Sequence, residues 1–400
     1  MWASVPVSRY AAYSKLTRNV AGEAMNANED MNCLTRREFL RATGIAAAGC
    51  ALYPSFAAAV ATDAEPHEAR FYEKLGGGLV RCGLCPWACV VSDGKRGRCE
   101  VRENRGGKYY SLVYGRPCAS NNDPIEKKPL FHVYPGSRAF SIATVGCNFE
   151  CKFCQNWDIS QKKPEELPVP YVAPEEIARV AAKEKCRTVA YTYSEPTIFA
   201  EYMIDCARAA KDLGLGNVVV SNGFISEKPL REVCSVMTAI KIDFKGFSQE
   251  FYGDICAGQL QPVLDTLKRL AASGTWFEMV NLMIPTLNDN MDNLKRMCEW
   301  IVKEVGPNVP VHFTRFHPDY KLKNLPPTPV ETLTRARQIA MEQGCNFAYT
   351  GNAPGEGGEN TFCPKCKAVM VDRYGYTAKV VNMKDGKCEK CGTVIPGVWK

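Results

Sequence analysis

Between residues 138 and 355, short runs of β-branched and aromatic residues alternate with longer stretches whose apolar residues recur at helical spacing. Pro174 stands at a typical first helical position, and the two glutamates after it suit the first turn of a helix. A second amphipathic stretch, residues 197–214, ends at a glycine and predicts a long helix. The predicted strands cover residues 139–146, 187–193, 217–221, 239–243, 277–284, 311–317 and 346–351.

Strands that alternate with helices in this way predict a parallel sheet with helical crossovers. We therefore expect an α/β fold, a full or partial (β/α) barrel, over residues 138–355. In such barrels the reactive groups gather at the carboxyl ends of the strands. Polar segments follow the predicted strands at residues 146–157, 193–197, 221–224, 242–246 and 315–320. Each segment alone could be ordinary loop sequence, but five at one edge predict a functional site.

The first of these segments, "GCNFECKFCQNW", holds three cysteines and no fourth nearby. The cysteines are Cys147, Cys151 and Cys154. Structural metal sites usually close with four protein ligands. A loop with three thiols either borrows a distant ligand, as a zinc knuckle would, or leaves one coordination position free.

Cysteine is frequent in the whole chain, with 20 residues, and pairs separated by two positions recur. This is the spacing of metal ligands rather than of a disulfide framework. Near the carboxyl end, two such pairs flank an alternating segment that predicts a hairpin. Residues 360–400 therefore predict a closed, structural zinc ribbon, with an iron–sulfur cluster as the alternative. The predicted ligands are Cys363, Cys366, Cys388 and Cys391.

A second group of four cysteines lies in residues 75–120, a segment poor in long apolar periodicity. Its C-x2-C spacing favours zinc, whereas Cys85-Pro86 and the C-x3-C spacing resemble iron–sulfur sequences, so both metals stay open. If this module holds a cluster, it could relay electrons to the predicted site. The predicted ligands are Cys82, Cys85, Cys89 and Cys99.

Residues 1–61 predict a leader. Arg36 and Arg37 precede an Ala-rich apolar stretch that is too short for a membrane span, which is typical of a twin-arginine export signal. The same stretch contains a weak lipidation motif that ends at Cys50. The leader predicts export of the folded protein or attachment to a membrane. A cytoplasmic location is the alternative, and the many thiols favour a reducing compartment during folding.

The C-x3-C-x-[aromatic]-C sequence at the end of a first strand resembles the signature of radical S-adenosylmethionine (SAM) enzymes, with Phe153 at the aromatic position. The surrounding text "IEKKPLFHVYPGSRAFSIATVGCNFECKFCQNWDISQ" resembles the radical SAM enzymes of the AmmeMemoRadiSam system, relatives of the pyruvate formate-lyase activating enzymes. Further matches are "AYTYSEPTIF", "DFKGFSQEFY", "TRFHPDYKL", "PPTPVETL" and "GEGGENTFCPKC". The resemblance covers about residues 75–400 and implies a partial barrel of the radical SAM type, flanked by small Cys-rich metal modules.

The resemblance implies that the three loop thiolates hold a [4Fe-4S] cluster, whose fourth iron is left for SAM. In the family, one electron from the cluster splits SAM into methionine and a 5′-deoxyadenosyl radical, which abstracts a hydrogen atom. The resemblance also implies SAM contacts. Here Tyr193 and Ser194 replace two family glycines just before the carboxylate that would bind the SAM ammonium group. The implied SAM-contacting residues are Phe153, Glu195, Asn222, Asp243, Lys245 and His317.

The substrate cannot be read from these residues. The resemblance implies a protein or peptide substrate, Memo-like or AMMECR-like partners, and an electron donor such as flavodoxin or ferredoxin. The net charge of +7 is spread along the chain, which argues against nucleic acid as a partner. The alternative to a radical SAM enzyme is a non-catalytic iron–sulfur or zinc protein that transfers electrons or binds a partner.

Overall fold

The computed structural model describes residues 66–353 and 357–400. The predicted leader, with Arg36, Arg37 and Cys50, lies outside these residues, so export and lipidation stay predictions. Among the described helices, none combines the length and the apolar character that a membrane crossing requires.

The centre of the molecule is an eight-stranded sheet with the order β14-β13-β12-β11-β10-β9-β8-β7. Neighbouring strands are parallel except at one edge, where β7 runs antiparallel to β8. The edge strands β7 and β14 do not pair with each other within the described residues, so the sheet is open. The strands are β7 (Ala119–Pro124), β8 (Arg138–Ala143), β9 (Thr188–Tyr191), β10 (Gly216–Ser221), β11 (Ala239–Asp243), β12 (Trp276–Met283), β13 (Val311–Arg315) and β14 (Ala348–Gly351).

An α/β fold with a parallel sheet is thus confirmed, and each of the seven predicted strands is present within a few residues of its predicted bounds. A closed barrel is not formed. The antiparallel strand β7 had no clear signal, because its sequence "ASNNDP" is polar. Buried aliphatic side chains of the strands, such as Ile142, Val189 and Ile240, pack in the main hydrophobic core. Burial of each such side chain contributes about 1.5–3 kcal/mol.

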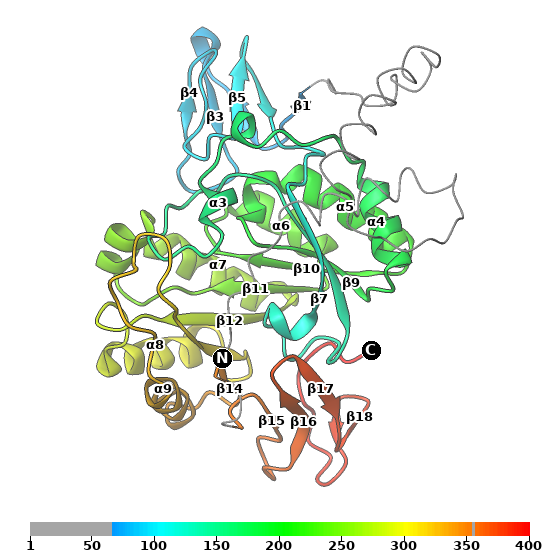
Figure 1. Cartoon of the computed structure of the whole chain (residues 1–400), viewed down its shortest axis with the longest axis vertical. Helices are drawn as coiled ribbons and strands as arrows, with labels where there is room; N and C mark the ends of the chain where they lie inside the picture. Colours follow the sequence, from blue (N-terminus) through cyan, green and yellow to red (C-terminus); the bar gives the residue numbers. More distant parts are fainter. Residues whose placement is uncertain (1–65, 354–356) are drawn as a thin grey trace, which may run out of the picture.

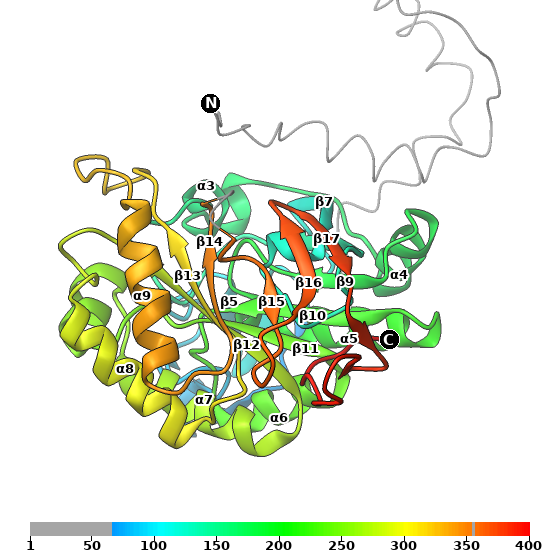
Figure 2. The same cartoon turned by 90° about the horizontal axis from the view of Figure 1, so that it is seen from below.

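The helices form an arc along one face of the sheet (Figure 2). The predicted start at Pro174 is confirmed, but the long predicted helix divides, because a 3-10 turn at Pro196–Phe199 precedes α5. This turn brings Glu195 close to the end of β9. The helices are α3 (Trp157–Ser160), α4 (Pro174–Lys183), α5 (Ala200–Asp212), α6 (Glu227–Val236), α7 (Leu260–Ser273), α8 (Met291–Glu304) and α9 (Val330–Glu342).

The amino-terminal module consists of two antiparallel three-stranded sheets, β1-β6-β5 and β2-β3-β4. It packs on the carboxyl end of the central sheet, where the amide of Ser226 donates to the carbonyl of Leu84 at 3.1 Å. A buried ion pair between Arg102 and Glu201 joins it to α5. The strands are β1 (His67–Glu68), β2 (Tyr72–Lys74), β3 (Val80–Cys82), β4 (Val90–Val91), β5 (Arg102–Arg105) and β6 (Lys108–Ser111).

The carboxyl-terminal module lies at the opposite end of the molecule (Figure 1). Its strands β16 and β17 form the predicted hairpin, with Gly375 in the turn. The guanidinium of Arg373 in this hairpin donates to the carbonyl of Phe131, and Val398 pairs with Val133, so the module closes against the segment before β8. The strands are β15 (Thr361–Phe362), β16 (Val369–Tyr374), β17 (Thr377–Val380), β18 (Met383–Lys384) and β19 (Lys387–Cys388).

Candidate active site and metal centres

The loop that carries the three-cysteine sequence begins directly after β8 and ends at α3. Gly146 in this loop has a φ of +94°. A Cβ at this position would lie 2.5 Å from Cγ1 of Val101 and 3.2 Å from the carbonyl oxygen of Cys99. Glycine is required here both by the backbone conformation and by the close approach of the amino-terminal module. The first predicted ligand, Cys147, follows immediately.

The three loop cysteines converge, since each pair of their side chains interacts electrostatically. Within the described residues, the carboxyl-terminal cysteines alone have their sulfur atoms all within 4.8 Å of one another, and the three loop cysteines do not. In a [4Fe-4S] cluster each thiolate binds a different iron, so the sulfurs must lie farther apart than around one ion. Cys147, Cys151 and Cys154 are thus not gathered around a single-ion position, which is compatible with a cluster.

Hydrogen-bond donors also face these sulfurs, as expected for thiolate ligands. The amide of Phe149 donates to Sγ of Cys147 at 3.4 Å, and Oγ of Ser160 lies 3.2 Å from Sγ of Cys154. Burial raises the pKa of Cys147 and of Cys154. Both thiols would therefore be neutral without a metal, and metal coordination would deprotonate them.

Cys256, in the segment between β11 and α7, lies next to this loop. Its thiol lies next to that of Cys151, and this contact lowers the pKa of Cys151. Its carbonyl accepts from the amide of Glu150 at 3.0 Å. From the sequence, Cys256 is expected only in the core, because a single cysteine in an apolar segment is typical of a core position. In the structure Cys256 is buried in the core and also lies next to Cys151, a predicted cluster ligand.

Glu195, at the carboxyl end of β9, is buried and interacts electrostatically with Cys147. Its carboxylate accepts hydrogen bonds from Oγ of Ser221 at 2.7 Å and from the amide of Asn222 at 2.8 Å. Burial nevertheless raises the pKa of Glu195. Tyr193, which the resemblance places at a family glycine position, has a φ of +67°, a conformation that normally favours glycine. Its glycine-like backbone lies in the turn before Glu195.

Asn222, after β10, points toward the three-cysteine loop. Its Nδ2 donates to Oδ1 of Asn148 at 2.8 Å, and Nδ2 of Asn148 donates to the carbonyl of Phe224 at 3.0 Å. These bonds fix the cluster loop to the end of β10, so Asn222 acts as a positioning residue in this structure. Asn148 was missed because an asparagine in a loop is ordinary sequence.

Asp243 is the last residue of β11 and Lys245 follows it, and the ammonium group of Lys245 lies 3.5 Å from the carboxylate of Asp243. The same ammonium lies 5.5 Å from the centre of the Phe153 ring and interacts electrostatically with Cys151. Burial alone would raise the pKa of Asp243, but Lys241 and Lys245 outweigh it and lower that pKa. Lys241 was missed, although a lysine inside an apolar strand indicates a buried partner.

His317 does not join this group. His317 lies in the segment after β13, and its side chain is exposed to solvent. The segment that carries it still approaches the site, because Tyr320 stacks on Trp157 with ring centres 5.2 Å apart, and the amide of Lys321 donates to the carbonyl of Lys152 at 3.0 Å. The structure therefore brings the three cysteines together with Phe153, Glu195, Asn222, Asp243 and Lys245, and leaves His317 at the rim.

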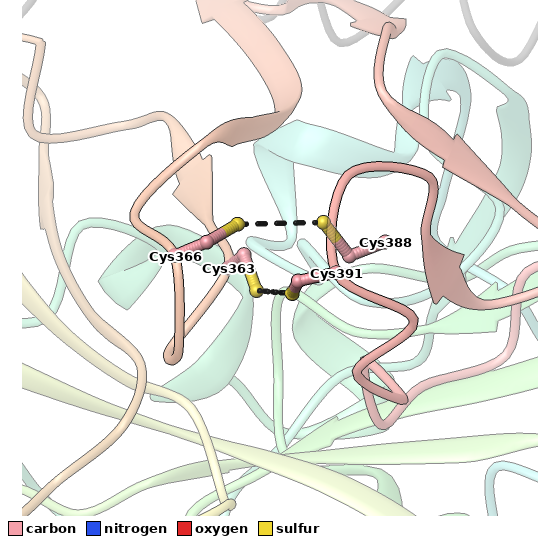
Figure 3. Close-up of side chains that lie close together, drawn as sticks. All are labelled: Cys363, Cys366, Cys388 and Cys391. Carbon is pink, nitrogen blue, oxygen red and sulfur yellow. Dashed lines mark hydrogen bonds between the residues drawn. The ribbon is translucent and has the colours of Figure 1, made fainter.

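The carboxyl-terminal cysteines form a different kind of centre (Figure 3). Their four sulfur atoms all lie within 4.8 Å of one another, which is the arrangement that a single metal ion requires. Sγ of Cys363 lies 3.5 Å from that of Cys391, and Sγ of Cys366 lies 3.6 Å from that of Cys388. The predicted pairing of two C-x2-C sequences into one four-sulfur group is thus present.

The amino-terminal cysteines also converge. Every pair among the four interacts electrostatically. Within residues 66–353 and 357–400, however, the carboxyl-terminal group alone has its sulfurs all within 4.8 Å of one another. The four residues are Cys82, Cys85, Cys89 and Cys99.

Comparison with known proteins gives a consistent relationship. A sequence profile described as the radical SAM superfamily matches residues 141–301, which include the whole three-cysteine loop. An uncharacterized protein of Methanocaldococcus jannaschii is 46% identical over 330 residues, covering 82% of this chain and 98% of that protein. The pyruvate formate-lyase 1-activating enzyme of Escherichia coli is 23% identical over 227 residues, covering 52% of this chain and 91% of that enzyme.

Among solved structures, a domain of the pyruvate-formate lyase-activating enzyme from Bacteroides vulgatus matches with a TM-score of 0.38 and 18% identity, covering 41% of this chain and 98% of that domain. The sequence relationships, rather than this distant structural likeness, identify the family. The chain is a radical SAM enzyme, a member of the radical SAM superfamily that is related to the pyruvate formate-lyase activating enzymes.

Proposed function

We propose that this enzyme cleaves SAM reductively at a [4Fe-4S] cluster held by Cys147, Cys151 and Cys154, and that the resulting radical abstracts a hydrogen atom from a protein or peptide substrate. The observation that carries the proposal is the three-thiol loop at the carboxyl end of β8, which is flanked by charged side chains. Glu195 lies on the side of Cys147, and Lys245 lies on the side of Cys151. When bound, the cluster supplies one electron to the SAM sulfonium, which gives methionine and a 5′-deoxyadenosyl radical.

The chain's own residues supply orientation and charge. Glu195 retains acceptor capacity on its buried carboxylate for an ammonium group, and such an ionised contact is strong where water is excluded. Lys245 offers a cation to a carboxylate, and the ring of Phe153 packs beside it. Asn148 and Asn222 keep the loop in register with β10, so that the thiols and the charged groups hold a fixed geometry.

The proposed substrate class and partners rest on relationship. The related Escherichia coli protein is named for activating pyruvate formate-lyase, which is itself a protein. We therefore propose a protein or peptide substrate, an electron donor of the flavodoxin or ferredoxin class, and Memo-like or AMMECR-like partners. The amino-terminal leader remains proposed to direct export or membrane attachment.

Anaerobic reconstitution with iron and sulfide, followed by addition of SAM and dithionite, tests the function. We expect 5′-deoxyadenosine and methionine in equal amounts, and incorporation of deuterium into 5′-deoxyadenosine when a deuterated substrate is added. A matched Lys245→Met variant should keep the iron content but lose at least about tenfold in turnover, since a charged contact contributes about 1.5–3 kcal/mol. A reconstituted cluster that never cleaves SAM would instead support the non-catalytic electron-transfer or binding protein.

For the carboxyl-terminal module we propose structural zinc. The Cys366→Ser variant should lose about one zinc ion per chain and expose residues 360–400 to proteases, because ligand binding and folding of such a small segment are coupled. The iron content of the radical site should stay unchanged, since separate residues hold it. Zinc analysis with limited proteolysis measures both effects. Full zinc occupancy with a protease-resistant tail would show that these cysteines do not form a closed zinc site.

A further inference from the structure

We propose that Cys82, Cys85, Cys89 and Cys99 bind a second iron–sulfur cluster of the [4Fe-4S] type, directly beside the radical site. Cys82 ends β3, Cys85 and Cys89 lie in the loop before β4, and Cys99 lies in the loop before β5. The inference does not depend on the radical chemistry proposed above. It chooses between the two metals that the spacing in the sequence leaves open.

The spacing of the sulfurs carries the choice. A zinc ion draws four thiolates onto one centre with Zn–S bonds of about 2.3 Å, so their sulfurs must lie within about 4 Å of one another. The carboxyl-terminal group has this compact arrangement, as Figure 3 shows. Within the described residues, no three of the amino-terminal sulfurs lie together within 4.8 Å, and the same holds for the three cysteines of the radical site. A cubane, which binds each thiolate on a separate iron, accommodates sulfurs that are not gathered around one ion.

A second observation points to a ligand in the same place. Tyr109 is fully buried, and its hydroxyl has no hydrogen-bond partner in the protein. Buried hydroxyls are nearly always paired, so an orphaned one indicates a missing partner. The hydroxyl interacts electrostatically with Cys82, Cys89 and Cys99. A Cβ added to Gly97 would lie 2.6 Å from this hydroxyl and 3.8 Å from Sγ of Cys89, so glycine keeps the space open.

Cluster sulfides and thiolates accept hydrogen bonds, and such bonds tune the reduction potential of the cluster. The Tyr109 hydroxyl is therefore suited to donate to a sulfur of a bound cluster. Around a compact zinc site the thiolate sulfurs are the only acceptors, whereas a cubane adds inorganic sulfides between them. The amide of Arg98 donates to Sγ of Cys89 at 3.5 Å, which adds a backbone donor of the kind found at the radical site.

The two cysteine loops touch each other. Nε1 of Trp87, in the loop between Cys85 and Cys89, donates to the carbonyl of Asn148 at 2.9 Å. The Trp87 ring also packs on Phe224, with ring centres 5.1 Å apart, and the guanidinium of Arg98 lies 4.0 Å from the centre of its ring. The carbonyl of Cys99 faces Gly146, one residue before Cys147. A cluster in this module would thus be the immediate neighbour of the radical site.

The test uses the full chain with its radical site removed by the triple substitution Cys147→Ala, Cys151→Ala and Cys154→Ala. After anaerobic reconstitution we expect about four iron and about four sulfide ions per chain to remain, with charge-transfer absorbance near 400 nm and an EPR signal after reduction. Adding Cys85→Ser and Cys89→Ser should remove this iron and sulfide. A far-UV circular dichroism spectrum equal to that of the unsubstituted chain shows that each variant is folded.

Two results would overturn the proposal. The triple variant could contain an additional zinc ion and no sulfide, which would identify a second zinc site, or it could contain iron without sulfide, which would be adventitious metal. A further variant keeps all four ligands: Tyr109→Phe, placed in the triple background, should retain the iron but shift the midpoint potential of the cluster to more negative values. An unchanged potential would show that the hydroxyl does not face a cluster. Failure to cleave SAM has no bearing on any of these measurements.

Discussion

The Cys151→Ala substitution should reduce the iron of the radical site below detection and abolish SAM cleavage. A cubane with only two protein thiolates lacks an anchor for one of its irons. If the amino-terminal module binds a cluster, about four iron ions per chain should remain from an expected eight or so in the wild type. Iron and sulfide analysis, EPR of the reduced protein and a 5′-deoxyadenosine assay measure the effect.

The neighbouring thiol of Cys256 must be controlled for, because it lies next to Cys151 and could move into the vacated position. The double variant Cys151→Ala, Cys256→Ala removes this route and should show the same loss. Cys206→Ala is the matched control, since Cys206 is a buried cysteine on α5 that no predicted cluster contains. Wild-type iron, EPR signals and SAM cleavage in the Cys151→Ala protein would exclude the proposed cluster ligands.

The central sheet could be predicted because its strands are apolar runs between amphipathic helices, and that pattern leaves few alternatives. The edge strand β7 could not, since its polar sequence is stabilised by pairing with β8 and by side chains such as Asp123, whose carboxylate accepts from the ammonium group of Lys128 at 2.6 Å. Such contacts link residues whose local sequence carries no strand signal. The fold prediction therefore succeeded where burial dictates the sequence.

The candidate site divides in the same way. The cysteines could be predicted from their spacing, and Glu195 and Lys245 from their place after strands together with the family resemblance. Asn148, Lys241 and Cys256 are parts of the site only through contacts across the fold, with Asn222, Asp243 and Cys151 respectively. His317 shows the converse: its position after a strand predicted a role at the site, and its side chain lies exposed at the rim.

The buried ion pair between Arg102 and Glu201 gives the second large effect. Both side chains are almost fully inaccessible, Nη1 of Arg102 lies 3.0 Å from Oε1 of Glu201, and Nε of Arg102 donates to the carbonyl of Ile198 at 3.1 Å. The pair connects β5 of the amino-terminal module with the first turn of α5. Removing one partner of a buried pair leaves the other charge uncompensated, which typically costs about 3–5 kcal/mol.

Glu201→Met should therefore lower the free energy of unfolding in urea by about 3–5 kcal/mol, whereas the double variant Arg102→Met, Glu201→Met should recover much of the loss, because two apolar side chains carry no buried charge. The exposed Arg231→Ala, which breaks the Glu227–Arg231 pair on α6, should change the free energy of unfolding by less than about 1 kcal/mol.

Burial alone would raise the pKa of Glu201, but the charge of Arg102 outweighs burial and lowers that pKa. The pair thus contributes stability at neutral pH, and this contribution is lost as the pH falls through the lowered pKa of Glu201. The wild-type advantage over the double variant should accordingly shrink in acid. If Glu201→Met unfolded at the wild-type urea concentration, the ion pair could not be what holds the amino-terminal module against α5.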